Sequence, residues 1–440
     1  MKIVEMKVTP VSIADAPLRN SIGIHEPYVG RIVVELVSED GHSGFGESAF
    51  STQMLADLES VREVIVGRDA LEITQVRQII DGRLHRQPDA GSKDSLDGVL
   101  QAFDLTPRRR TTAVERTFSP IEVASLDLAG QSFGVPVCDL LGGRVRDAVP
   151  FSAYLFYKHA GGGGEGDDAR DDIYSEAMTA EAVVAQAKAM IAEYGFPSIK
   201  LKGGVLPPDD EIEAIQALRA AFGPDVPLRI DPNCAWTVET SVRVAKALAR
   251  ELEYFEDPTP GIDGMSALRG ELLATGIDLP LATNMAVTSY AEIQESVAKD
   301  AVQVILGDHH YWGGLRAIVE LGRLCETFGM GLSMHSNSHL GISLMAMTHV
   351  AAATPNLTYD ADTHYPWLHA ADDVIEGGKI AFKDGAVEVA TTPGLGIAID
   401  RDALARGHER FQRVPYRDRD DIGYMRRTVD PAWEKRLPRW

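Results

Sequence analysis

The first 145 or so residues combine two patterns of apolar and polar positions. The stretch "RIVVELVSEDGHSGFGES" (31–48) alternates apolar and polar residues on either side of "EDGHSG", a cluster typical of a turn, and this predicts a β-hairpin. The stretch "SPIEVASLDLAGQSFG" (119–134) has apolar residues at helical spacing, which predicts a helix that ends at Gly134. Residues 85 to 112, between the two, are polar and rich in Arg and Asp. A solvated connection and a lid over a site explain them equally well.

From about residue 149 the pattern changes to short β-branched runs that alternate with helical stretches. "TAEAVVAQAKAMIAEYG" is a helical stretch, with Thr179 as a plausible N-cap and Gly195 just beyond its end. Repeated strand-then-helix units predict a parallel sheet with right-handed crossovers, and seven or eight units in a row favour a closed (β/α) barrel. The predicted strands are "SIKLK" (198–202), "VPLRID" (226–231), "LEYFED" (252–257), "DLPLAT" (278–283), "VQVILGD" (302–308) and "MGLSMH" (330–335).

The last 60 residues leave this repeat. They contain short strand-like runs and tight turns, followed by the helical stretch 401–413, and the simplest arrangement packs them against the N-terminal domain. The predicted fold is therefore α/β: a TIM-type barrel of seven or eight units at residues 146–375, an α+β capping domain at residues 1–145, and a C-terminal segment, residues 376–440, that packs back on the cap.

Composition narrows the class of protein. The chain has 440 residues, enough for a large barrel and a second domain. Its 65 acidic and 43 basic residues give a net charge of −22, which argues against binding to nucleic acid or to an anionic membrane. The three cysteines, far apart and without metal-site spacing, and the absence of a signal-like start or a long apolar run predict a cytoplasmic location. We also expect a homo-oligomer.

Polar side chains end six successive predicted strands. They are separated by 24 to 29 residues, which matches one strand-and-helix unit each time, and they are Lys202, Asp231, Glu256, Asn284, Asp308 and His335. In barrels of this type the catalytic groups come from the carboxyl ends of several strands. The spacing therefore predicts one shared site.

Three of these residues are hard oxygen donors. Asp231, Glu256 and Asn284 come from adjacent predicted strands and together form a half-shell suited to Mg²⁺, which keeps its other positions for water and substrate oxygens. Any one of them alone is more commonly a helix N-cap or a turn residue. No Cys or His pair accompanies them, so the set does not suit zinc.

The remaining strand ends supply candidate bases. His335 and Asp308 close consecutive strands, so they could meet, and a carboxylate behind a histidine orients its ring. His335 alone is more commonly a core histidine. Lys200 and Lys202 lie two apart on one strand and project to the same face, which would be costly inside a barrel unless an anion lies opposite. The two glycines that follow are expected to let the loop clear a substrate.

These motifs resemble the glucarate dehydratase family of the enolase superfamily. "KLKGG", "IDPNCAW", "FEDP", "ATNM", "GDHHYWGG" and "HSNSHLGIS" stand in the family's order, and the resemblance covers nearly the whole chain, including "GIHEPY", "PGLGIAID" and "RDDIGYM". Asn284 stands where an acidic third metal ligand is common elsewhere in the superfamily. Ser119 stands where the family usually has threonine and keeps the hydroxyl group.

The resemblance implies a role for each residue. Asp231, Glu256 and Asn284 would bind Mg²⁺, while Lys202 and the His335–Asp308 pair would act as bases on opposite faces of the substrate. Lys200 and Asn233 would hold the substrate carboxylate and its developing charge. The implied contacts to a small dicarboxylate substrate come from His25, Ser119, Tyr154, Lys200, Asn233, Ser336, Asn337, His364 and Arg419.

The activity implied by the resemblance is the Mg²⁺-dependent dehydration of D-glucarate, with L-idarate as the epimeric substrate. A dehydratase for another acid sugar such as galactarate remains open as an alternative. Two bases also permit epimerisation or racemisation, and a homologue that binds an aldarate or a partner protein without catalysis is a third class. The segment "HSNSHLGIS" departs from the sequences of some family members, which leaves the substrate preference open.

Overall fold

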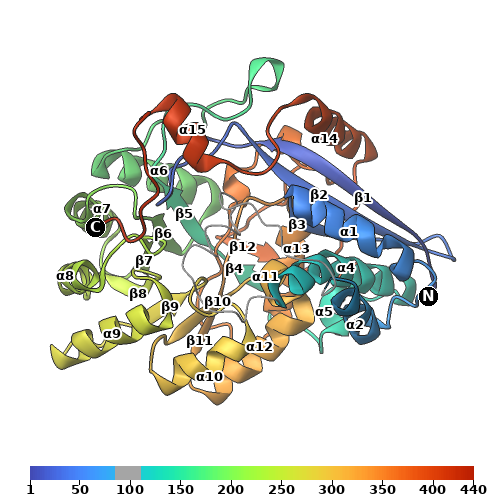
Figure 1. Ribbon diagram of the computed structural model, residues 1–440, viewed down its shortest axis with the longest axis horizontal. Helices are drawn as coiled ribbons and strands as arrows, with labels where there is room; N and C mark the ends of the chain where they lie inside the picture. The colour runs from blue at the N-terminus through green and yellow to red at the C-terminus, as the bar shows by residue number, and fades with distance from the viewer. Residues whose placement is uncertain (85–110) are drawn as a thin grey trace.

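The computed structural model describes residues 1–84 and 111–440 and consists of a barrel joined to a cap (Figure 1). Residues 85–112 were expected to form either a lid or a solvated connection. All of this segment except its last two residues lies outside the described range. In Figure 1 the N-terminal sheet and its helices lie on one side, and the barrel occupies the other side of the molecule. This arrangement confirms the predicted fold class, whereas the exact domain boundaries remain a prediction.

The cap is built on a three-stranded antiparallel sheet in the order β1 (Ile3–Ala14), β2 (Tyr28–Ser38) and β3 (Ser43–Ala49). The predicted hairpin is the β2–β3 pair, in which Val33 lies opposite Glu47. The helices α1 (Thr52–Ile65) and α4 (Thr111–Phe133) pack against the sheet, and α2 (Ile73–Leu84) packs against these two helices. A Cβ atom at Gly46 would clash with the Pro120 carbonyl of α4, so a residue without a side chain allows the helix to lie directly on the sheet.

The barrel begins with seven parallel strands that pair in chain order. Their side chains are buried almost throughout, as expected for a parallel sheet covered by helices. The strands are β5 (Ser152–Phe156), β6 (Ser198–Lys202), β7 (Leu228–Asp231), β8 (Leu252–Glu256), β9 (Leu281–Thr283), β10 (Val304–Gly307) and β11 (Gly331–Met334). The helices between them are α6 (Ala180–Tyr194), α7 (Pro208–Phe222), α8 (Val238–Leu248), α9 (Gly261–Ala274), α10 (Tyr290–Ala298), α11 (His309–Trp312) and α12 (Leu315–Thr327).

Residues 358–362 close the barrel as an eighth stave. On one side, the Thr358 N–H donates to the Leu332 carbonyl (3.0 Å) and the Asp362 N–H donates to that of Met334 (2.9 Å). On the other side, the Ser152 N–H donates to the Ala361 carbonyl (2.9 Å). The segment therefore bridges β11 and β5, and it brings Asp362 to the same end of the barrel as the other strand ends.

The barrel helix α6 has the boundaries that its sequence predicts. The Thr179 hydroxyl accepts a hydrogen bond from the Ala182 N–H (3.3 Å), and Gly195 adopts the left-handed conformation with φ 75°. A capping hydroxyl at one end and a glycine at the other satisfy backbone groups that the helix leaves unpaired.

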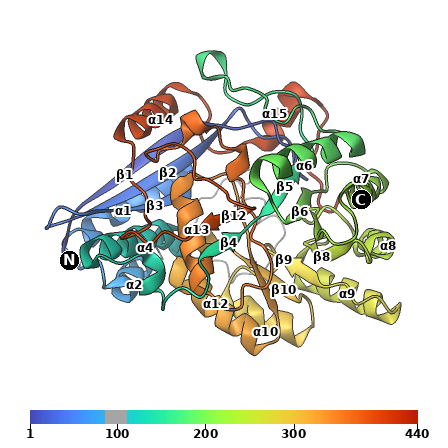
Figure 2. The same cartoon turned by 180° about the vertical axis from the view of Figure 1, so that it is seen from behind.

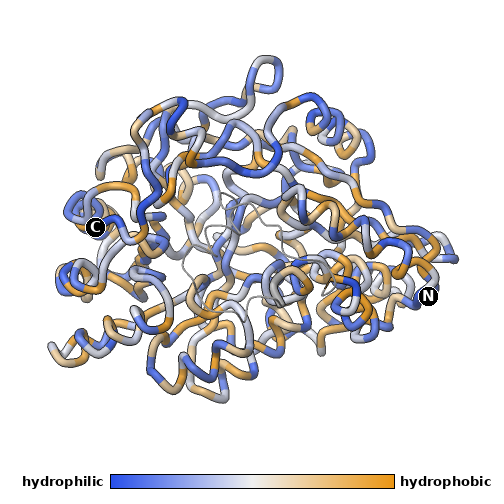
Figure 3. The backbone as a smooth tube through the Cα atoms, in the orientation of Figure 1, coloured by the Kyte–Doolittle hydropathy of each residue, from blue (hydrophilic) through white to orange (hydrophobic). Residues whose placement is uncertain are grey.

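Cap and barrel meet along α13 (Gly341–Ala353), which lies between them in Figure 2. All 13 residues of this helix are buried. In the C-terminal segment, β12 (Ala386–Glu388) pairs antiparallel with β4 (Ala148–Pro150), and α14 (Arg401–Arg413) packs against β1. Figure 3 shows α14 as predominantly hydrophilic, in keeping with its place on the outside of the cap. The remaining helices are the short α5 (Val137–Leu140) and α15 (Asp421–Thr428).

None of the described helices combines the length and the apolar character needed to cross a membrane.

Candidate active site

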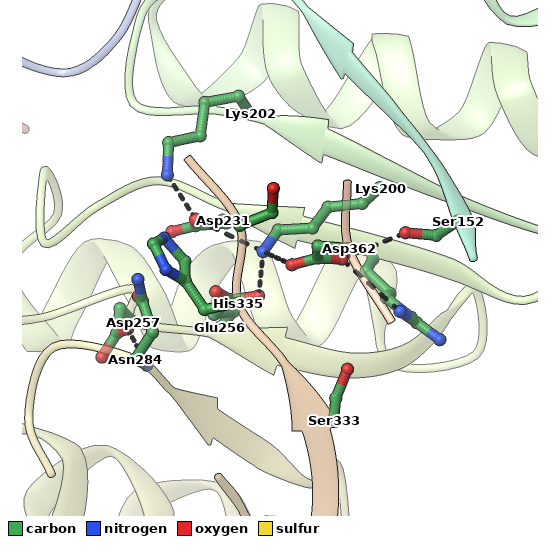
Figure 4. A network of polar contacts seen from close by, with 12 residues as sticks. Ser152, Lys200, Lys202, Asp231, Glu256, Asp257, Asn284, Ser333, His335 and Asp362 are labelled. Atoms are coloured by element: carbon green, nitrogen blue, oxygen red, sulfur yellow. Dashed lines mark hydrogen bonds and ion pairs between the residues drawn. The ribbon is translucent and has the colours of Figure 1, made fainter. Parts of the chain in front are cut away.

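Lys200 lies at the centre of a charged cluster inside the barrel mouth (Figure 4). Its Nζ atom is 2.6 Å from Asp362 Oδ2, 2.6 Å from Glu256 Oε2 and 3.7 Å from Asp231 Oδ2. Burial alone would lower the pKa of this lysine, but Asp362 and Glu256 outweigh it and raise the pKa well above the ordinary value. Lys200 is therefore a permanent cation, and the anions that its burial requires come from the protein itself.

Lys202, two residues further along β6, reaches the mouth of the barrel. Its Nζ atom donates to Asp231 Oδ2 (2.5 Å) and to Asn233 Oδ1 (2.8 Å). Asn233 and Cys234 have positive φ angles of 47° and 60°, and the Asn233 N–H donates back to Asp231 Oδ1 (3.0 Å). Strained backbone of this kind is commonly found at functional sites. Here it turns the Asn233 amide towards the ammonium group of Lys202.

Glu256 and Asn284 present buried oxygens without a protein donor. Glu256 Oε1 and Asn284 Oδ1 accept no hydrogen bond from the described residues, and Glu256 Oε2 has the ammonium group of Lys200 as its partner, at 2.6 Å. Burial, together with Asp231 and Asp362, raises the pKa of Glu256 well above the ordinary value despite the attraction of Lys200. Three carboxylates share the Lys200 ammonium group, so Glu256 lacks a compensating cation of its own.

Asp257 fixes the loop that carries Asn284. Its Oδ1 atom accepts from the Thr283 hydroxyl (2.5 Å), and its Oδ2 atom accepts from the N–H groups of Asn284 (2.8 Å) and Met285 (3.1 Å). Burial and the nearby Asp231 raise the pKa of Asp257 to about 7. The carboxylate thereby aims the Asn284 side chain without using an oxygen of that side chain.

These observations fit a hard divalent cation. Two carboxylates and an amide come from three neighbouring strands, and Glu256 Oε1 and Asn284 Oδ1 have no donor among the described residues. Magnesium binds such oxygen ligands and leaves further positions for water and substrate. Asp231, the third predicted ligand, also pairs with Lys202, so a cation bound there would share this carboxylate with the lysine.

On the opposite side of the mouth, His335 and Asp308 form the predicted pair. His335 Nδ1 lies 2.8 Å from Asp308 Oδ2, and the other oxygen of Asp308 lies 2.8 Å from His310 Nδ1. Burial alone would raise the pKa of Asp308, but His310 and His335 lower it well below the ordinary value. An ionised carboxylate only accepts, so Nδ1 of His335 carries the proton, and Nε2 forms no hydrogen bond with the described residues.

Asp308, His309 and His310 offer potential metal ligands within 4.8 Å of one another, the one set of three His, Cys, Asp or Glu residues in residues 1–84 and 111–440 that does so. Two of its members already bind each other, and His310 Nε2 also lies 3.0 Å from the Ser343 hydroxyl. We therefore assign this set to the support of His335. The Asp231 site is a separate group that includes an asparagine.

Four predicted substrate contacts lie around the barrel mouth. The Tyr154 ring lies beneath both lysines, with Lys200 Nζ 4.7 Å and Lys202 Nζ 5.9 Å from its centroid. The Ser336 hydroxyl accepts from the His364 N–H (3.0 Å), and the His364 ring packs edge-on against Tyr154 at 4.7 Å. Asn337 donates to Asp308 Oδ2 (3.3 Å), so in this structure it supports the base pair.

The other three predicted contacts come from the cap and the C-terminal segment. Ser119 on α4 has a buried hydroxyl that forms no hydrogen bond with the described residues. His25 Nδ1 lies 3.0 Å from Asp15 Oδ2, and Arg419 Nε donates to Asp421 Oδ1 (2.8 Å). His25 and Arg419 are thus held by carboxylates of the cap and the C-terminal segment.

The sequence motifs missed several supporting residues. Asp362 lies on the eighth stave, which has no recognisable strand pattern. No local sequence pattern indicates its ion pair with Lys200. The two glycines after Lys202 have a packing role that the sequence did not indicate. A Cβ atom on Gly203 would meet the Glu211 carboxylate at 2.5 Å, and one on Gly204 would clash with the Pro232 carbonyl. These glycines allow close packing of the loop against the protein.

The chain is similar to known proteins over its whole length. A family model described as enolase C-terminal domain-like matches residues 182–403. A curated protein from Streptomyces coelicolor, described as a probable glucarate dehydratase, is 46% identical over 449 residues, which cover 100% of this chain and 99% of that protein.

Solved structures extend the likeness to the whole fold. An enolase from Pseudomonas fluorescens with bound magnesium, potassium and tartrate has a TM-score of 0.92 and 46% identity, covering 100% of this chain and 99% of that chain. An enolase from Mycobacterium smegmatis complexed with tartrate has a TM-score of 0.89 and 50% identity, covering 100% of this chain and 98% of that chain.

Proposed function

The chain belongs to the enolase superfamily, and from this premise we propose that it is an acid-sugar dehydratase that acts on D-glucarate and takes L-idarate as the epimeric substrate. One observation carries the proposal. Two groups able to remove a proton, Lys202 and the His335–Asp308 pair, flank a set of buried oxygens with unused acceptor capacity. A relative with 46% identity, described as a probable glucarate dehydratase, supports this choice of substrate.

The substrate carboxylate would be held by Lys200 and Asn233, next to the oxygens of Asp231, Glu256 and Asn284. The last three residues would hold Mg²⁺, which when bound would draw electron density from the substrate carboxylate and make the neighbouring proton more acidic. Magnesium and tartrate, a small dicarboxylate, are both present in the related structure from Pseudomonas fluorescens. Lys200 adds a fixed positive charge at the same place.

Proton removal is the first step. A proton next to a carboxylate is far less acidic than any side chain, so the base works only where the resulting enediolate charge is stabilised. His335 Nε2 takes the proton from one configuration of the carbon, while Nδ1–H stays on Asp308. Lys202, when neutral, takes it from the epimer. Its hydrogen bonds to Asp231 and Asn233 orient the amine for this role.

Elimination of water follows. The electron pair of the enediolate forms the carbon–carbon double bond as the bond to the β-hydroxyl breaks. The leaving hydroxyl takes the proton that His335 Nε2 now carries and departs as water. The enol then becomes a keto-deoxy acid. His25, Ser119 and Arg419 are placed in the cap and C-terminal segment, where they would bind the hydroxyls and the distal carboxylate.

A screen of acid sugars with Mg²⁺ tests the proposal. D-Glucarate, L-idarate, galactarate and further aldarates are incubated with the protein, and keto-acid formation is measured. We expect D-glucarate and L-idarate to give the same keto-deoxy product. Turnover of galactarate alone would mean that galactarate, and not D-glucarate, is the substrate. Exchange of solvent deuterium without any keto product would mean that the protein is an epimerase and not a dehydratase. The absence of both reactions would contradict catalysis.

A further inference from the structure

The loop of residues 335–340, between β11 and α13, carries the predicted base His335, and two buried side chains of the cap sheet hold it. These are Arg31 on β2 and Glu47 on β3, each 1% exposed. Arg31 Nε donates to Glu47 Oε1 (2.7 Å), which makes them a buried ion pair. A buried ion pair gives little net stability of its own, so its placement calls for another explanation.

Glu47 holds the far end of the loop. Its Oε1 atom accepts from the Leu340 N–H (2.8 Å), and its Oε2 atom accepts from the Ser343 N–H (3.0 Å). Leu340 is the N-cap residue of α13 and offers no side-chain acceptor, so the cap sheet supplies the carboxylate that the helix start requires. Glu47 thereby fixes where α13 begins and where the loop before it ends.

Arg31 reaches the middle of the loop. Its Nη1 atom donates to Asn337 Oδ1 (3.1 Å), and Asn337 Nδ2 donates to Asp308 Oδ2 (3.3 Å). Asp308 Oδ2 is also the oxygen that lies 2.8 Å from His335 Nδ1. A guanidinium group only donates and a carboxylate only accepts, so the amide of Asn337 has one orientation that satisfies both neighbours. A directional chain therefore runs from Arg31 to His335.

The second base has no part in this chain. Lys202 is held by Asp231 and Asn233, which lie on β7 and directly after it. In the described part of the protein, none of the hydrogen bonds of Arg31 or Glu47 goes to these three residues. A defect at Arg31 should therefore affect one base and leave the other in place.

We propose that Arg31 is a positioning residue for the His335 base, acting from the cap sheet through Asn337 and Asp308. The inference rests on the proposed function insofar as it assumes two bases of opposite facial selectivity. It goes beyond that function because it assigns a role to a residue outside the barrel. It also makes the cap a contributor to proton transfer on one face of the substrate.

Arg31→Lys tests the chain with little change in charge. Lysine can keep a positive charge beside Glu47, but a single ammonium group cannot reproduce the fork that also binds Asn337. We expect kcat for D-glucarate dehydration to fall tenfold to a hundredfold with little change in KM, as is usual when an outer hydrogen-bond partner is lost. Lys202-dependent deuterium exchange on L-idarate should stay within twofold of the unmutated protein. An equal loss on both substrates, or no loss on either, would overturn the proposal.

Two further variants test the route. Arg410→Lys is the matched control, because Arg410 also forms a buried ion pair in the periphery, with Asp372 (2.5 Å), but has no hydrogen bond to the loop. It should leave the ratio of the two activities unchanged. Asn337→Ala should reproduce the selective loss. Adding it to Arg31→Lys should lower kcat little further, because the effects of substitutions within one hydrogen-bond network are not additive. Full additivity would overturn the route through Asn337.

A spectroscopic measurement separates this inference from the proposed function. The His335 Nδ1–H resonance is assigned by its loss in His335→Asn and is then compared between the unmutated protein and Arg31→Lys. We expect it to shift or broaden in Arg31→Lys but not in Arg410→Lys, whichever acid sugar the protein turns over. An unchanged resonance would contradict the positioning role even in an active enzyme. Failure of the acid-sugar screen alone would contradict only the proposed function.

Discussion

The two sides of the barrel mouth hold the two proposed bases in different ways. On the β6–β8 side, Lys202 is bound by Asp231, and this carboxylate is also a predicted magnesium ligand. On the β10–β11 side, His335 is bound by Asp308, which has no place in the predicted metal set and is shared with His310. Both lysines, Asp231 and Glu256 come from the barrel, and the cap reaches this side through the Ser21 hydroxyl, which donates to the Asn233 carbonyl (3.3 Å). The His335 loop is tied to the cap sheet itself, by Arg31 and Glu47.

The two proposed bases should therefore respond differently when the metal site or the cap is changed. A cation on Asp231 changes the electrostatic surroundings of Lys202 directly. His335 shares no carboxylate with that cation, because its partner Asp308 belongs to another hydrogen-bonded group. Changes at Arg31 or Glu47 in the cap should affect His335 and not Lys202, since these two side chains contact the His335 loop and not the β6–β8 side.

Loss of the predicted metal site should impair proton removal by His335 and by Lys202 alike, because both depend on that site. In Glu256→Gln, or with chelator in the unmutated protein, we expect activity on D-glucarate and exchange on L-idarate to fall together by on the order of a thousandfold or more. The reason is that stabilisation of the substrate carboxylate serves either base. Steady-state rates measured over a magnesium titration check this.

Glu251→Gln is the matched control for that experiment. Glu251 precedes β8 and pairs with Arg219 (3.0 Å) on the outside of the barrel. Its replacement should leave the magnesium dependence unchanged. Activity of Glu256→Gln that remains near that of the unmutated protein would remove Glu256 from the metal set.

Replacement of one base should expose the contrast most directly. In His335→Asn we expect D-glucarate dehydration to fall by about a thousandfold, while Lys202-dependent deuterium exchange on L-idarate continues. Lys202→Gln should give the reverse selectivity for proton exchange. Mass spectrometry of recovered substrate in deuterated water measures both. Loss of both exchange reactions in either variant, with the fold intact, would mean that the two-base assignment is wrong.

The sequence revealed the shared site but not its support, for a physical reason. Lys202, Asp231 and Glu256 each end a predicted strand, and parallel strands bring their carboxyl ends together whatever the details of packing. Asp362 and Arg31 act through contacts between segments 162 and 306 residues apart in the chain, respectively. No periodicity or local motif marks such a pair, so only the folded structure identifies it.

In the fold as well, local sequence patterns predicted some elements, while elements that depend on long-range contacts were missed. The strand-and-helix repeat predicted the barrel, and Thr179 and Gly195 marked the ends of α6 because capping is a local interaction. The eighth stave at residues 358–362 escaped the pattern. It binds β11 and β5 through backbone groups, and its short run of mixed residues carries no alternation to recognise.

Removal of the Lys200 partner should affect both faces to a smaller extent. Asp362→Asn takes away the carboxylate that lies 2.6 Å from Lys200 Nζ, and Ser152 also donates to that side chain (3.0 Å). Lys200 would then be drawn towards Glu256 and Asp231. We expect kcat to fall on the order of a hundredfold with either substrate, because Lys200 serves the carboxylate and not one face. A loss confined to D-glucarate would contradict that role.

The smallest expected effect concerns the helix behind the His335 loop. His349 on α13 is buried, its Nδ1 atom accepts from the Cys138 N–H (3.3 Å), and its Nε2 atom lies 3.1 Å from the Leu395 carbonyl. Burial lowers the pKa of His349 to about 4, and a proton on Nδ1 would face another N–H group. The unfolded chain takes up this proton near pH 6.5, so stability is full above that pH and is lost as the pH falls towards 4.

His349→Asn should remove this part of the pH dependence. Between pH 7.5 and pH 5 we expect the free energy of unfolding to fall by about 2 kcal/mol less in His349→Asn than in the unmutated protein. The substitution also costs stability at every pH through lost packing, so the slope and not the absolute value carries the result. Urea unfolding at the two pH values measures it. His42→Asn, at an exposed turn of the cap, should leave the slope unchanged, and equal slopes in all three proteins would mean that His349 does not weaken the fold in acid.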